Sequence, residues 1–82
     1  MSYKYQCPCC GNYTFENEPV GNYDICPVCF WEDDPMAYKF PQADSCSNFV
    51  SLVQARKNYL EFGACHKDML IHCRPPKEDE LP

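Results

Sequence analysis

Short alternations of aromatic and polar residues dominate the first third of the chain. Residues 3–6 alternate in this way and predict a short strand, because a period of two places one face against a core. Residues 13–15 predict the returning strand, and residues 23–25 predict a third. The polar segment 16–22 contains a proline and a glycine and is typical of a loop. The pattern therefore predicts a small sheet of three short strands.

A clear helical period occurs only in the second half of the chain. One apolar stripe recurs at steps of three and four residues, at Leu52, Ala55, Tyr59 and Phe62. Ser51 and Gln54 match a capping box at the start of this stripe, and Gly63 is a typical helix stop. We expect this helix to pack its apolar stripe on the sheet.

A shorter helix is predicted between two prolines. Asp34 is a good N-cap and Pro35 suits the first helical position, whereas Pro41 ends the helix by Phe40. The acidic run 32–34 has two interpretations: a patch for a basic partner, or a capped turn in solvent. The second is favoured, because carboxylates are common at helix starts.

The C-terminal quarter shows weaker signals. Residues 64–70 predict a turn or a single helical turn, and the apolar residues 69–71 predict a last strand before the prolines at 75 and 76. Residues 77–82 are mostly acidic and predict a mobile tail. The expected organisation is one domain over residues 1–76 followed by this tail.

Composition narrows the class of protein. An 82-residue chain builds only a small core, so it commonly needs a metal or disulfides for stability. The eight cysteines could indicate a secreted disulfide scaffold. However, no apolar run near residue 1 matches a signal peptide, and none is long enough to span a bilayer. We therefore expect a cytoplasmic protein.

Two pairs of cysteines carry the strongest chemical signal. Cys7 and Cys10 are separated by two residues, and so are Cys26 and Cys29. This spacing lets one tight turn aim two sulfurs at one point, and two such turns supply four thiolates in a tetrahedral shell. Gly11 after the first pair can adopt positive φ and close its turn. The sequence predicts one Zn²⁺ held by these four cysteines.

The order of strand, cysteine turn, strand, loop, strand and cysteine turn is that of a zinc ribbon. The predicted fold class is thus a small α+β metal-stapled domain with a C-terminal helix on its sheet. Phe30 and Trp31 are expected to pack beside the metal and exclude water.

Three stretches form a joint pattern over most of the chain. They are Cys-Pro-Cys-Cys-Gly at 7–11, the run from Tyr23 through Cys26, Cys29 and Trp31 to Asp34, and Phe-Gly-Ala at 62–64. Together with Ser51-Leu52, Ala55-Arg56 and Asn58-Tyr59, this pattern resembles the cysteine-rich CPCC family of small, mainly bacterial proteins, from Tyr5 to about Pro76. The resemblance implies a compact zinc-ribbon domain in a bacterial or phage setting and supplies no activity.

The two cysteine turns alone are also similar to those of rubredoxin, in which four thiolates hold one iron and pass single electrons. The sequence departs from rubredoxin at Phe30, where rubredoxins carry glycine. A side chain there is expected to impede a second tight turn with N–H···S bonds. Iron electron transfer is retained as an alternative.

Four cysteines lie outside the predicted shell. Cys9 could compete for the metal or act as a reactive thiol, but a tolerated small residue is the favoured interpretation. Cys46, Cys65 and Cys73 could form a second metal site with His66 or His72, although no spacing supports it. Buried or unreactive thiols are favoured over that site and over a cysteine–histidine catalytic pair.

Charge bears on the partner. The chain has twelve aspartates and glutamates and seven lysines and arginines, which gives a net charge of −5. A surface that binds nucleic-acid phosphates needs clustered positive charge. A nucleic-acid-binding ribbon is therefore the less favoured alternative. The sequence predicts a non-enzymatic zinc protein that binds another protein. A basic partner and an inhibitor or immunity role would suit its acidic charge.

Overall fold

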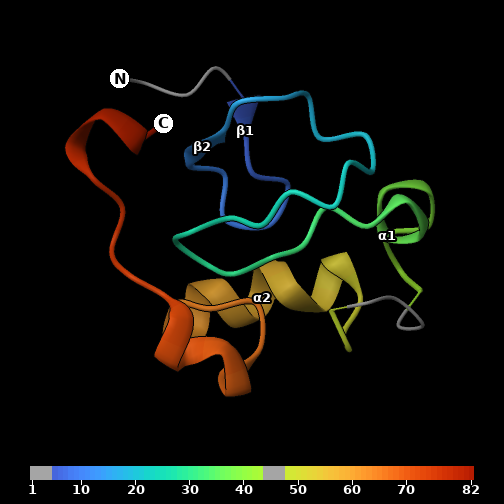
Figure 1. Cartoon of the computed structure of the whole chain (residues 1–82). Coiled ribbons are helices and arrows are strands. Elements are labelled where there is room, and N and C mark those ends of the chain that lie inside the picture. Colours follow the sequence, from blue (N-terminus) through green and yellow to red (C-terminus); the bar gives the residue numbers. More distant parts are fainter. Residues whose placement is uncertain (1–4, 44–47) are drawn as a thin grey trace.

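The computed structural model describes residues 5–43 and 48–82. Its elements in chain order are strands β1 (Tyr5–Gln6) and β2 (Tyr13–Phe15), helices α1 (Pro35–Lys39) and α2 (Leu52–Phe62), and the 3-10 helices η1 (Lys67–His72) and η2 (Glu78–Glu80). Figure 1 shows the N-terminal half lying over α2, with α1 at one end. Within the described residues this is a small α+β domain.

β1 and β2 form the first hairpin, as the alternation predicts. They pair antiparallel with Tyr5 opposite Phe15 and Gln6 opposite Tyr13, and a bulge shifts the register between the two pairs. The hairpin closes where the Cys7 amide donates to the Asn12 carbonyl at 2.9 Å. Residues 3 and 4 of the expected first strand lie outside the described residues.

The expected third strand at 23–25 does not form. Ile25 makes an isolated antiparallel bridge with Glu32, and the sheet has two strands, β1 and β2. Tyr23 has φ 61°, a left-handed conformation that interrupts an extended segment. The backbone bonds of this segment instead reach residues 31–33, because the second cysteine turn folds that part of the chain back beside it.

Helix α1 begins and ends where the sequence predicts. The Asp34 side chain accepts hydrogen bonds from the amides of Met36 and Ala37, and Pro35 occupies the first turn. The helix ends at Lys39. Asp34, however, is 8% exposed, so the favoured picture of an acidic turn in solvent is wrong for this residue.

Asp33 is also buried, and its carboxylate holds the preceding loop. Its Oδ2 accepts from the amides of Gly21 and Asn22 at 2.9 and 3.0 Å. Gly21 has φ 101°, and a Cβ on it would lie 2.7 Å from the Pro35 side chain. The loop can approach α1 this closely only because residue 21 is glycine.

Helix α2 follows its sequence signals in most respects. Ser51 Oγ accepts from the Gln54 amide at 3.0 Å, and Gly63 closes the helix with φ 88°. The second half of the expected capping box differs, since the Gln54 side chain points forward and donates to Asn58 Oδ1 at 2.8 Å. Asn58 in turn donates to the Cys65 carbonyl, which satisfies a polar side chain on the buried face.

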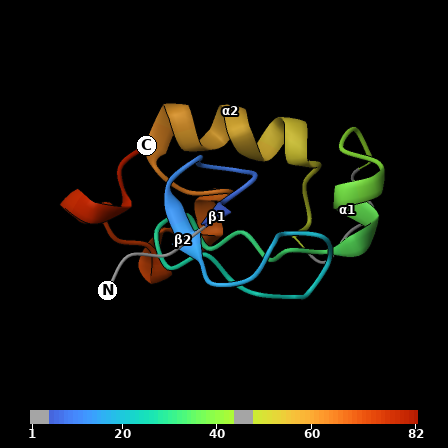
Figure 2. The same ribbon diagram turned by 90° about the horizontal axis from the view of Figure 1, so that it is seen from above.

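The buried face of α2 covers the cysteine turns (Figure 2). Arg56 Nε donates to the Pro8 carbonyl at 2.8 Å, and Asn12 donates to the Tyr59 hydroxyl at 3.1 Å. The buried core joins the N-terminal half of the chain to α2 and to the segment that follows it, through Cys7, Cys9, Phe15, Cys26, Val28, Cys29, Trp31, Ala37, Leu52, Ala55 and Cys65. The helix stripe therefore packs mainly on sulfur-bearing loops.

The C-terminal segment contains the expected helical turn, as η1, but differs from two other expectations. Residues 69–71 belong to η1 and form no strand, because i→i+3 bonds from His66 onward hold them in this helix. Residues 78–80 form η2 beside β2, where Glu80 is 2% exposed and accepts two bonds from Arg74 at 2.8 Å (Figure 1). The expected mobile tail is thus a packed segment. No helix among the described residues could cross a bilayer.

Candidate metal centre

Two backbone turns of the same shape carry the four predicted ligands. In the first cysteine turn, residues 7–11, the Gly11 amide donates to the Cys7 carbonyl at 2.9 Å. In the second cysteine turn, residues 26–30, the Phe30 amide donates to the Cys26 carbonyl at 2.8 Å. Gly11 and Phe30 both have positive φ, 79° and 65°. The second turn therefore closes despite the side chain at position 30, but residues 26–30, all within the described chain, make no N–H···S bond like that from the Cys9 amide to Cys7 Sγ, which is the feature the side chain was predicted to impede.

The turns bring the four sulfurs together. Cys7 Sγ lies 3.6 Å from Cys29 Sγ, and Cys10 Sγ lies 3.7 Å from Cys26 Sγ. All four ligand atoms lie within 4.8 Å of one another. A tetrahedron with metal–sulfur bonds of about 2.3 Å has sulfur–sulfur edges of about 3.8 Å. These distances fit one tetrahedral metal ion and are far too long for disulfides.

The cluster is enclosed by protein. Cys7, Cys26 and Cys29 are at most 1% exposed, whereas Cys10 is partly exposed. Trp31 and Val28 are also at most 1% exposed and belong to the same core, as predicted for Trp31. Four protein ligands leave no position for a water or a substrate, so the arrangement suits a structural metal.

Two neighbouring groups donate toward the sulfurs. The Cys9 amide lies 3.4 Å from Cys7 Sγ, and the Thr14 hydroxyl lies 3.1 Å from Cys26 Sγ. Hydrogen bonds of this kind stabilise a thiolate and orient it toward the metal. Thr14 was not predicted as part of the site. Its signal is a polar side chain, 4% exposed, in a strand that directly follows the first cysteine turn.

The electrostatics of the cluster call for a cation. Burial raises the pKa of the Cys7 thiol, while hydrogen bonds from Cys10, Cys29 and Cys7 lower the pKa of Cys26. Four adjacent sulfurs cannot all ionise, because each thiolate disfavours the next. A divalent ion removes this repulsion and binds all four as thiolates.

The remaining described cysteines stand apart from this cluster. Cys9 and Cys65 are buried in the core, and Cys73 Sγ donates to the Met69 carbonyl at 3.2 Å. Burial raises the pKa of Cys65 to about 12 and also raises the pKa of Cys73. Both therefore stay protonated at neutral pH, which supports the favoured picture of unreactive thiols. Cys46 lies outside the described residues.

No second metal site is present in the described parts of the chain. The four predicted ligands form the one group there with metal-ligating geometry. His72 stacks on the Phe30 ring with centroids 4.6 Å apart, and His66 Nδ1 accepts from the Asp68 amide at 3.1 Å. Both histidines thus have local roles in packing and capping.

Comparisons with known proteins identify the group to which this chain is related. No curated protein matches its sequence. The family model described as "Cysteine-rich CPCC" matches residues 5–80, which covers both cysteine turns, α2 and the packed C-terminal segment. The chain therefore belongs to the cysteine-rich CPCC family.

Proposed function

We propose that this protein is a non-enzymatic binding module stabilised by one structural Zn²⁺ on Cys7, Cys10, Cys26 and Cys29. The observation that carries the proposal is the buried tetrahedral arrangement of these four sulfurs between two turns of the same shape. When bound, the ion supplies a rigid cross-link between the two halves of the ribbon. The surrounding residues hold its ligands and exclude water.

Zinc is favoured over iron because few groups tune the sulfurs. Electron-transfer iron sites adjust their potential through hydrogen bonds to sulfur. Across residues 5–43 and 48–82, one backbone amide, from Cys9, and one hydroxyl, from Thr14, reach the four ligands. A structural ion needs no such tuning.

Elemental analysis with an absorption spectrum, on protein purified without added metal, tests the metal. We expect about one zinc per chain and no visible absorption. One iron per chain with a red-brown spectrum would replace the proposal with a rubredoxin-like electron carrier. Folded, reduced protein without any metal would refute it.

The distribution of charge supports a basic protein partner. Residues 5–43 carry one cation, Lys39, against six carboxylates: Glu16, Glu18, Asp24, Glu32, Asp33 and Asp34. Residues 48–82 carry equal numbers of acidic residues and of lysines and arginines. The acidic excess of the described chain therefore lies in the ribbon half, where it would attract positive and repel polyanionic partners.

A mobility-shift assay at low salt separates a protein partner from a nucleic acid. We expect no retardation of single- or double-stranded DNA, because phosphate binding depends on clustered cations. Affinity capture from extracts of the source organism, with chemical cross-linking, is expected to retain a basic protein. A salt-dependent DNA shift would favour a nucleic-acid-binding ribbon instead.

A further inference from the structure

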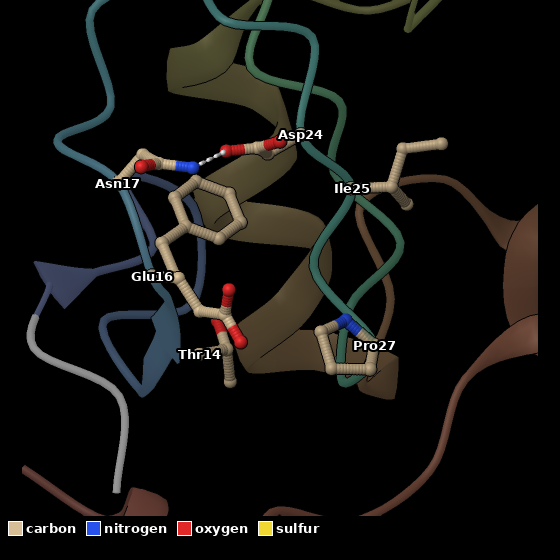
Figure 3. Close-up of a pocket in the computed structure, with 7 residues that line it drawn as sticks. Thr14, Glu16, Asn17, Asp24, Ile25 and Pro27 are labelled. Carbon is tan, nitrogen blue, oxygen red and sulfur yellow. Dashed lines mark hydrogen bonds between the residues drawn. The ribbon is translucent and has the colours of Figure 1, made fainter.

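A groove runs between β2 and the segment 24–27 on the ribbon half. Its volume is about 320 Å³, and it is lined by Thr14, Phe15, Glu16, Asn17, Asp24, Ile25 and Pro27. Figure 3 shows the labelled side chains of residues 14–17 on one side, and those of Ile25 and Pro27 on the other. We call it the β2 groove. Its volume is at the small end for binding sites, which suits a side chain or a short segment.

The groove exists because the third predicted strand does not join the sheet. β2 pairs with β1, whereas Ile25 pairs with Glu32. In the described chain, no strand pairing therefore links β2 to residues 24–27. Two side-chain contacts link the two sides: the Thr14 hydroxyl lies 3.1 Å from Cys26 Sγ, and a longer hydrogen bond runs from Asn17 Nδ2 to Asp24 Oδ2 at 3.4 Å (Figure 3). A bond of this length is weak and easily exchanged for a ligand contact.

The lining combines apolar surface with negative charge. Ile25 is 47% exposed, and Pro27 also lines the groove. Glu16 and Asp24 supply two carboxylates, and no lysine or arginine lines the groove. Among the described residues, the Glu16 carboxylate has no hydrogen bond or ion pair.

We propose that the β2 groove binds a lysine or arginine side chain carried by an extended segment of a partner protein. The aliphatic part of such a side chain would pack on Ile25 and Pro27, and its cationic head would bind Glu16 and Asp24. Arginine suits the two carboxylates best, since its planar fork offers several donors. The inference rests on the proposed binding function and names the surface and the chemistry of the partner.

The probe for this groove is a short capped peptide with one central arginine between valines, compared with the same peptide carrying glutamine. The measurement is an amide NMR titration of the metal-loaded full chain. We expect the arginine peptide to shift the amides of residues 14–17 and 24–27, with binding that weakens as salt is added. The glutamine peptide should leave these amides in place.

Charge-removing variants make the test specific. The isosteric double variant Glu16→Gln, Asp24→Asn should bind the arginine peptide at least about tenfold more weakly, since each lost charged contact weakens binding by roughly that factor. Glu61→Gln, which removes one exposed charge on α2, serves as the control and should bind like the wild type. Melting temperature and metal content of each variant are measured to confirm the fold.

Three outcomes would overturn the inference: no binding of the arginine peptide, amide shifts confined to another surface, or equal affinity in the double variant. The proposed function fails by different results, namely absence of a metal or a DNA mobility shift. If a captured partner binds the double variant and the wild type equally, the binding function stands and the β2 groove is excluded as its site.

Discussion

At the scale of single residues, Phe30 shows how a site can form with an unfavourable residue. It adopts the left-handed conformation that Gly11 provides in the first cysteine turn, at a cost of about 1–2 kcal/mol. In return, its ring stacks on His72 and lines a small cavity with Cys65 and Met69. The side chain thus connects the second cysteine turn to η1, a contact that glycine could not make.

Thr14 is the residue whose effect on the metal is easiest to isolate. Thr14→Val keeps the shape of the side chain but removes the hydroxyl beside Cys26 Sγ. We expect zinc affinity to fall about tenfold, because loss of a group that hydrogen-bonds a ligand typically has this effect. Competition with a chromogenic chelator measures it. Thr14→Ser keeps the hydroxyl and is the control; equal affinity in the valine variant would contradict the role.

Asp33 has a structural role that cannot be distinguished in the sequence from that of the acidic residues on either side of it. Asp33→Ala removes the buried acceptor of two amides in the loop before it. We expect the free energy of unfolding to drop by about 2 kcal/mol, since both donors lose a charged partner. Thermal melts compare it with Asp79→Ala, which changes an exposed carboxylate. If the two variants have the same melting temperature, the loop does not depend on Asp33.

At the scale of elements, the packing of η2 depends on one ion pair, between the partly exposed Arg74 and the buried Glu80. Glu80 accepts from Arg74 Nη1 and Nη2 and from the Lys77 amide, each at 2.8 Å. Because both partners come from residues 74–80, the pair closes this segment on itself, and the segment packs beside β2. The charged pair is therefore a clasp for the C-terminal segment.

The clasp should depend on pH. The Arg74 guanidinium holds the pKa of Glu80 below its ordinary value of 4.5. A folded-state pKa that is lowered contributes stability above the ordinary pKa, and this stability is lost as pH falls through the lowered value. Glu80→Gln should therefore melt below the wild type at neutral pH.

The difference in melting temperature between wild type and Glu80→Gln is the measurement, taken from about pH 7 to about pH 3. It should narrow steadily below pH 4.5. Metal content is measured at each pH, and only points at which both proteins keep their ion are compared, since loss of the metal is expected to abolish the melt. A difference that is constant across this range would show that the clasp acts without charge.

At the scale of the whole molecule, the four-cysteine cluster is part of the hydrophobic core. The buried core contains Cys7, Cys26 and Cys29, three of the four candidate ligands, beside Trp31 and the inner face of α2. A chain of 82 residues has little other core with which to offset its conformational entropy. Folding and metal binding should therefore be coupled.

Cys7→Ser and Cys29→Ser are expected to unfold most of the chain, as is a strong chelator. Far-ultraviolet circular dichroism should lose the α2 signal, and the cooperative melt should disappear. Cys73→Ser is the matched control, because Cys73 lies outside the cluster and serine can still donate to the Met69 carbonyl. Retained helix and a cooperative melt in both ligand variants would show that the chain folds without the intact metal site.

Local features of the sequence determined the candidate site. Two residues between cysteines fix each turn by short-range geometry, so Cys7, Cys10, Cys26 and Cys29 could be identified without a structure. The same holds for the Asp34 cap and for α2. Each of these signals depends on residues that lie close together in the sequence.

Contacts between distant segments were decided only by the tertiary structure. The sequence could not show that residues 23–25 would bond to 31–33 and leave the β2 groove open, because a strand-like composition at 23–25 does not specify the segment with which it pairs. Nor could it show that Glu80 would be buried, since an acidic run reads as solvated until a partner such as Arg74 is placed beside it. Charge and periodicity describe a residue's neighbours along the chain, whereas burial depends on which segments meet in space.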